Sequence, residues 1–170
     1  MSDAVLSRPL IVATVPPAGV SIEVVADKAE RAALAAENDV LSIERLVARL
    51  EVRPVGRGSL SVTGALEALA TRQCVVTLEP FVEAVAEEVD VRFAPEDGGD
   101  EPSGDDAPED RIAGGMVDLG SVAAEFFVLG LDPYPRKPGA TFDAAAGAAD
   151  ESGSPFAALR GLKPRSGEPD

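Results

Sequence analysis

The stretch from Ser59 to Pro95 constrains the fold more than any other part of the sequence. A long series of apolar residues falls there on even-numbered positions, with interruptions at Gly64 and Arg72; its members are Leu60, Val62, Leu66, Ala68, Ala70, Cys74, Val76 and Leu78. Successive side chains of a β-strand point to opposite faces, so this two-residue period predicts an extended strand with one apolar face.

The same stretch is too long for one strand, because strands rarely exceed about ten residues. A bend or bulge is therefore expected near Gly64 or residues 71–73, and a reversal at Glu79-Pro80, where proline suits the second position of a turn. Beyond the reversal, a second apolar series alternates with polar neighbours: Val85, Val89, Val91 and Phe93. The sequence thus predicts a long hairpin with one apolar face.

Charge limits the partners that such a chain can bind. The sequence has 30 acidic and 15 basic residues, a formal net charge of −15. This charge repels a phosphate backbone at long range, which excludes strong non-specific nucleic-acid binding but permits a local basic patch.

One cysteine excludes an internal disulfide and fits a reducing compartment. No apolar run approaches about twenty residues and no signal-like N-terminus is present, so we expect a cytoplasmic protein without a membrane segment.

Two strands and a helix are expected at the start of the chain. The β-branched run over residues 8–15 predicts the first strand, and residues 21–25 predict a second, shorter one. Asp27 and Glu30 have the spacing of a capping box and predict an alanine-rich helix over residues 28–37.

A second helix is expected to begin after Ser42. Its apolar residues have the i, i+3, i+4 and i+7 spacing of a helical stripe: Ile43, Leu46, Val47 and Leu50. Residues 51–55 predict a short strand, and the glycines at 56 and 58 predict the turn that leads into the hairpin.

Composition changes abruptly after Phe93. Residues 95–111 are rich in carboxylates, proline and glycine and contain no large apolar side chain, so they cannot bury enough surface to offset their ordering entropy. We expect a disordered acidic insertion within a single domain that spans residues 1–142.

One further helix is expected after this insertion. Asp118 can cap it, and its apolar stripe consists of Leu119, Val122, Phe126 and Leu129. Beyond an extended segment, residues 143–154 predict a flexible linker, residues 155–163 a docking turn and residues 164–170 a disordered tail.

The resulting fold class is α+β, with an antiparallel sheet built on the long hairpin, two helices before it and one after it. The strand over residues 8–15 is expected to join that sheet.

Three motifs carry a resemblance to a known family. They are CVVTLEP at residues 74–80, VDLG at residues 117–120 and DPYPRKPG at residues 132–139. Together they resemble the YceD family of large ribosomal RNA subunit accumulation proteins, especially its alphaproteobacterial and organellar branch. The positions that match the family pattern are Cys74, Leu78, Glu79, Pro80, Asp118, Leu119, Glu125 and Pro133. The resemblance implies a role in the accumulation or maturation of large-subunit ribosomal RNA.

The residue types that usually carry chemistry predict no enzyme here. Cys74 lies in the buried phase of its strand, and the chain has no histidine to activate it. Relatives in the family commonly have cysteine pairs at this point and after the last helix, which would suit a metal. Valine and the PRKP run stand at those places here, so no metal or other cofactor is expected. The carboxylates Glu79, Glu83, Glu87 and Glu88 fit a solvated strand face, and a carboxylate-based hydrolase is a remote alternative.

Binding candidates lie near the C-terminus. Tyr134, Arg136 and Lys137 form a local basic and aromatic cluster, which either contacts RNA or packs Tyr134 and pairs its cations with carboxylates of the same domain. Arg160, Lys163 and Arg165 extend the set of candidates. The first hypothesis is a non-catalytic factor that contacts a ribosomal RNA precursor or an early particle. The second is an acidic adaptor for a basic ribosomal protein or an RNA-processing enzyme, without RNA contact. Neither hypothesis includes a small-molecule substrate.

Overall fold

A computed structural model describes residues 5–56, 58–95 and 110–141 of the chain. The predicted linker, docking turn and tail, together with Arg160, Lys163 and Arg165, lie outside the described residues, as does most of the predicted acidic insertion. In chain order the elements are β1 (Pro9–Ile11), a 3-10 turn (Val12–Thr14), β2 (Val20–Val25), α1 (Lys28–Glu37), β3 (Ser42–Val55), β4 (Ser59–Gln73), β5 (Pro80–Pro95), β6 (Asp110–Ile112), β7 (Met116–Asp118) and α2 (Leu119–Leu129).

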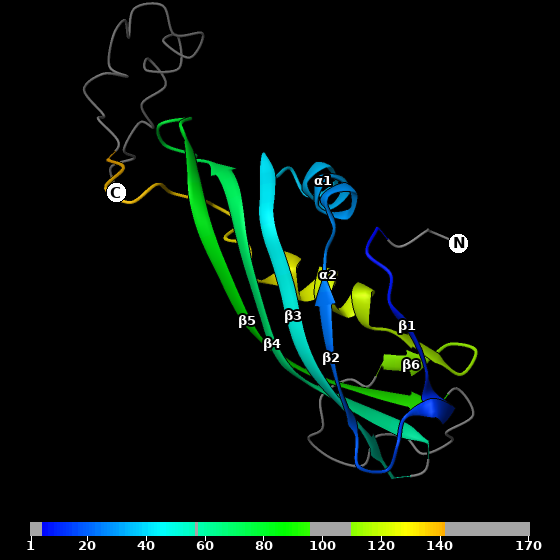
Figure 1. Ribbon diagram of the computed structural model, residues 1–170. Helices are drawn as coiled ribbons and strands as arrows, with labels where there is room; N and C mark the ends of the chain where they lie inside the picture. The colour runs from blue at the N-terminus through cyan, green and yellow to red at the C-terminus, as the bar shows by residue number, and fades with distance from the viewer. Residues whose placement is uncertain (1–4, 57, 96–109, 142–170) are drawn as a thin grey trace, which may run out of the picture.

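The main sheet has five strands in the order β2-β3-β4-β5-β6 (Figure 1). Every neighbouring pair is antiparallel except β5 and β6, which run parallel. The α+β class and the antiparallel sheet are therefore confirmed. The buried core combines one face of this sheet with Leu34 and Ala35 of α1 and several residues of α2, so both helices lie on the same side of the sheet.

The predicted hairpin is the centre of that sheet. Strands β4 and β5 pair without interruption from Leu60 opposite Phe93 to Gln73 opposite Pro80. The even-numbered side chains of β4 point into the core, and the pattern continues to Cys74, which is fully buried. It stops there, because Leu78 lies in the connecting turn with a positive φ of 59° and its side chain is exposed.

The predicted second helix is wrong, because residues 42–55 form strand β3. The register of β3 against β4 shifts between Ile43 and Arg45, which leaves one extra residue, Glu44, in β3. This bulge puts Ile43 and Leu46, three residues apart, on the same buried face, and Val47 is buried on the opposite face. A β-bulge therefore reproduced the spacing of a helical stripe.

The first strand is shorter than expected and lies elsewhere. Only Pro9–Ile11 forms β1, and the chain then enters the 3-10 turn. Strand β1 pairs with β7 in a separate two-stranded sheet, Leu10 opposite Val117, so the prediction that it joins the main sheet is wrong. The N-terminal segment is thereby held beside the start of α2.

Helix α1 begins as predicted. The Asp27 carboxylate accepts hydrogen bonds from the Ala29 and Glu30 amides, and the Glu30 side chain accepts one from the Asp27 amide. Glu30 also pairs with Arg8, Nη1 to Oε1 at 2.7 Å. This hydrogen bond from Arg8 lowers the pKa of the Glu30 carboxyl despite the opposing effect of burial.

Helix α2 also begins at the predicted cap, but its buried stripe differs. Leu119 and Val122 are buried as expected, whereas Leu129 is 67% exposed and Phe126 is only partly buried. Phe127 is the aromatic residue at the centre, with no exposed surface. Neither described helix is both long and apolar enough to cross a membrane.

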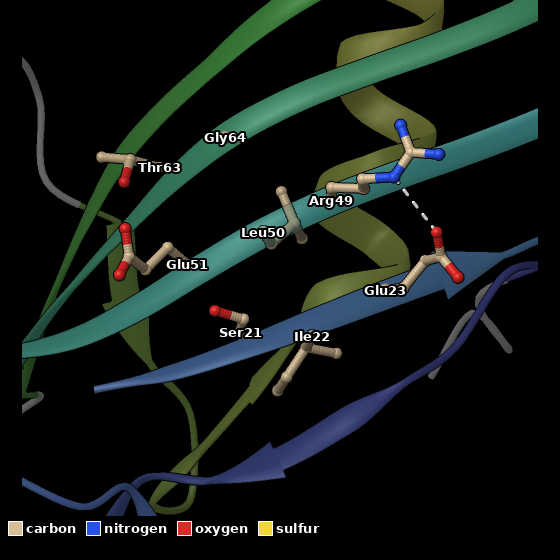
Figure 2. A pocket seen from close by; sticks show the side chains of 8 residues that line it. All are labelled: Ser21, Ile22, Glu23, Arg49, Leu50, Glu51, Thr63 and Gly64. Atoms are coloured by element: carbon tan, nitrogen blue, oxygen red, sulfur yellow. Dashed lines mark hydrogen bonds and ion pairs between the residues drawn. The ribbon is translucent and has the colours of Figure 1, made fainter. Parts of the chain in front are cut away.

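Gly64 is the residue of β4 at which β3 comes closest. An added Cβ atom would lie 2.0 Å from the Arg49 carbonyl oxygen, so no side chain fits there. On the outer face a shallow depression lies beside Gly64, lined mostly by polar and charged residues of β2, β3 and β4 (Figure 2). Glu23 and Arg49 are paired across it, Oε1 to Nε at 3.2 Å. The depression therefore offers no unpaired catalytic set.

Candidate binding surface at the hairpin tip

The connection between β4 and β5 is a tight, internally bonded turn. The Cys74 amide donates to the Glu79 carbonyl, and the Leu78 amide donates to the Cys74 carbonyl, each at 2.9 Å. The Gln73 side-chain amide donates to the Leu78 carbonyl at 3.0 Å. These bonds hold Leu78 in its left-handed conformation, with its side chain pointing into solvent.

The segment after α2 runs back to this turn (Figure 1). The Val75 amide donates to the Pro135 carbonyl at 2.9 Å, and Lys137 Nζ donates to Glu79 Oε2 at 2.9 Å. Pro135 itself is buried. The structure therefore brings together two of the motifs singled out in the sequence, residues 74–80 and residues 132–139.

Arg72 joins the same two segments from inside. It is the charged residue at the interruption of the apolar period, and it is buried. Its Nη2 donates to the Asp132 carbonyl at 3.0 Å and its Nη1 to Glu83 Oε2 at 3.2 Å. A buried guanidinium needs such partners. In the sequence Arg72 is visible only as an interruption of the apolar period. Its hydrogen bonds to β5 and to the segment after α2 were not predicted.

Four side chains form what we term the tip surface: Val75, Leu78, Tyr134 and Arg136. Tyr134 is 71% exposed and Leu78 is 67% exposed. Arg136 is also exposed and makes no ion pair within the described part of the chain. The sequence left open whether the basic cluster contacts RNA or packs against its own domain. Lys137 is paired with a carboxylate of the domain, whereas Tyr134 does not pack against it.

Cys74 lies beneath this surface. The Thr77 amide hydrogen bonds to its sulfur at 3.5 Å. A hydrogen bond with the Thr77 side chain outweighs burial and, with backbone amides of Lys137, Thr77 and Val76, lowers the pKa of the Cys74 thiol to about 7. The fully buried position agrees with its expected place in the apolar phase.

We expect Cys74 to react slowly with a small thiol reagent, through openings that lift the segment after α2 but keep the turn intact. The midpoint of the rate's rise with pH should then lie below the ordinary pKa of a free thiol, because Thr77 still stabilises the thiolate in that state. Stopped-flow alkylation across pH measures it. Thr77→Val should move the midpoint upward, and a wild-type midpoint at the ordinary value of a free thiol would show that reaction needs unfolding of the turn.

The carboxylates of the hairpin do not converge on one site. Glu79 pairs with Lys137, and Glu83 pairs with Arg72. Glu87 and Glu88 follow one another in β5 and so point to opposite faces of the sheet. Each acid therefore either neutralises a cation of its own domain or stands alone, which gives no support to a hydrolase.

Comparison with protein families decides the relationship. The family model described as large ribosomal RNA subunit accumulation protein YceD matches residues 62–163, more than half of the chain. The chain belongs to the YceD family. Curated proteins and solved structures gave no match. The assignment to the alphaproteobacterial and organellar branch stays a prediction.

The family-motif residue Asp118 has a structural position in this YceD protein. Its carboxylate caps α2 through the Gly120 and Ser121 amides and also accepts the Arg8 amide and the Ser7 hydroxyl. Burial opposes ionisation, but these four hydrogen bonds prevail and lower the pKa of the Asp118 carboxyl. Gly120 lies so close to the N-terminal segment that an added Cβ would be 2.6 Å from the Leu6 carbonyl oxygen. The VDLG motif therefore joins α2 to the N-terminal segment.

The other matching positions divide between core and surface. Leu119 is buried, whereas Glu125 of α2 is exposed, as are Pro80 at the start of β5 and Pro133. No group of three or more potential metal ligands occurs among the described residues.

Proposed function

We propose that this YceD protein is a cytoplasmic, non-catalytic binding factor in the accumulation of large-subunit ribosomal RNA. The description of its family supplies the link to that RNA. The tip surface supports action by binding, because it presents exposed apolar side chains on a turn held by backbone hydrogen bonds, without a cleft of convergent catalytic groups.

The observation that carries the choice of partner is the distribution of charge. The chain has a formal net charge of −15. Six of its described cationic side chains are already paired with glutamates: Arg8, Arg45, Arg49, Arg53, Arg72 and Lys137. Such a surface attracts a basic protein more strongly than an RNA backbone. We therefore favour an adaptor that binds a basic ribosomal protein or an RNA-processing enzyme.

Direct RNA contact is the second candidate, and Tyr134 and Arg136 favour it. An exposed tyrosine can stack on an unpaired base, and a neighbouring arginine without an ion pair can contact phosphate. Co-purification from cells, with and without RNA digestion, separates the candidates. Partners that survive digestion support the adaptor, and partners that vanish support RNA contact.

If Tyr134 and Arg136 contact RNA, the double variant Tyr134→Ala, Arg136→Glu should impair large-subunit RNA accumulation when it replaces the native protein in a depleted strain. Its melting temperature should stay within a few degrees of the wild type, because both side chains are exposed and surface substitutions usually change stability by less than about 0.5 kcal/mol. Lys28→Glu is the matched control, since Lys28 is an exposed cation at the start of α1. Full complementation by the double variant would contradict RNA contact through these two residues and leave the adaptor.

A further inference from the structure

Strand β5 has an unpaired edge along most of its length. On one side it pairs with β4 throughout, but on the other side β6 pairs only with Phe93, Ala94 and Pro95. From residue 81 to residue 92 no described strand lies along this edge, and Figure 1 shows β5 as the outermost strand there. At the usual rise per residue the open edge is about 40 Å long.

The backbone groups of this edge have no other partner in the described part of the chain. Turns and loops contribute backbone hydrogen bonds to Cys74, Val75 and Leu78, but none to residues 81–91. A strand edge with free N–H and C=O groups is a template for one more strand, and proteins use such edges to bind extended peptides.

The side chains of the edge define which peptide fits. On the outer face, Val82 is exposed, as are Ala84 and Ala86, and this apolar half is followed by Glu88, Asp90 and Arg92. Glu87 lies on the inner face. None of these three carboxylates forms an ion pair within the described chain, whereas Glu83 nearer the tip is paired with Arg72. The edge thus combines a small apolar half with a half in which three carboxylates outnumber one arginine.

We propose that the β5 edge accepts an extended basic segment of a partner protein as an additional strand of the main sheet. Alternate residues of that segment would be small and apolar beside Val82 to Ala86, and lysine or arginine beside Glu88 and Asp90. A second copy of this chain is disfavoured, because it has the same formal net charge of −15. That the partner belongs to large-subunit assembly rests on the proposed function; the strand addition itself does not.

Two synthetic peptides test the strand addition on the purified full-length protein. Both are eight residues long with valine at every second position. The remaining positions carry two alanines at one end and, at the other, two lysines in one peptide and two glutamates in the other. We expect the lysine peptide to bind with salt-sensitive affinity and to slow amide exchange within residues 82–90, and the glutamate peptide not to bind. A lysine peptide with N-methyl groups on alternate residues should also fail, since it cannot form the strand ladder.

Charge reversal gives the decisive comparison. Glu88→Lys with Asp90→Lys should weaken lysine-peptide binding at least tenfold. Glu37→Lys with Glu125→Lys changes the net charge equally on the exposed surfaces of α1 and α2 and should leave most of the affinity. Equal losses in both double variants, or slowed exchange elsewhere in the sheet, would overturn the proposal. So would a concentration-dependent dimer that protects this edge, or an oligoribonucleotide that competes for it.

The same β5 variant separates this inference from the proposed function. Loss of peptide binding together with reduced large-subunit RNA in a depleted strain supports both. Loss of peptide binding with normal RNA accumulation supports the strand addition and contradicts its place in ribosomal RNA accumulation.

Discussion

Truncating Phe127 to alanine is expected to lower the free energy of unfolding by about 3–5 kcal/mol, the usual cost of removing a buried aromatic side chain. Phe127 has no exposed surface and belongs to the core that joins α2 to the sheet. Removing its ring leaves a cavity between α2 and the main sheet, because the paired strands cannot move to fill the cavity. Urea unfolding followed by circular dichroism measures the difference from the wild type.

Phe126→Ala is the matched control for this prediction. Phe126 is the neighbouring aromatic residue on the same helix but is only partly buried. Its truncation removes the same atoms and should cost clearly less than that of Phe127. Equal destabilisation by the two variants would show that α2 is rotated relative to the arrangement described here.

The choice between these two phenylalanines shows what sequence periodicity can determine. The cap at Asp118 and the existence of α2 follow from local signals, because capping depends on neighbouring residues. The stripe through Phe126 and Leu129 has correct helical spacing, yet the sheet contacts a face rotated toward Phe127. Which face is buried depends on tertiary packing, and two adjacent phenylalanines give no local signal to decide it.

Strand β3 shows a different limit. Its buried residues after the bulge, Leu46, Ala48, Leu50 and Val52, alternate as a strand should. The bulge at Glu44 and the burial of Val47 on the outer face added apolar positions that matched a helix. An unbroken i, i+3, i+4, i+7 spacing indicates a helix, whereas the two-residue period of a strand was interrupted at the bulge. The sequence alone therefore favoured the helix. The long neighbour β4 settled the conformation by pairing, which is a non-local effect.

The candidate site was predictable only in part. The resemblance singled out residues 74–80 and 132–139, and the structure brings them together. The bonds that hold them, Lys137 to Glu79 and Arg72 to Asp132, join residues about sixty positions apart, for which one sequence has no periodic signal. The free edge of β5 was also hidden, since strand order depends on the whole sheet.

Replacing Gly64 by alanine is the second change for which we expect a large effect, a loss on the order of 3 kcal/mol or more of unfolding free energy. The added Cβ would lie 2.0 Å from the Arg49 carbonyl oxygen and 3.0 Å from the Leu50 Cα. These are backbone atoms of a paired strand, so relief requires separating β3 from β4 where Leu50 faces Gly64. The φ of 157° adds a smaller strain. Thermal unfolding and amide exchange of β3 and β4 measure the loss.

Gly114→Ala distinguishes crowding from backbone strain in this result. Gly114 has a positive φ of 58°, but an added Cβ there meets nothing within 4 Å. Its substitution should therefore cost only the local conformational penalty, about 1–2 kcal/mol. If Gly64→Ala costs no more than Gly114→Ala, the β3 backbone does not approach β4 as closely as described. A larger loss of unfolding free energy at Gly64 than at Gly114 means that this one glycine permits the close pairing of β3 and β4. The core residues of α1 and α2 are buried against these two strands.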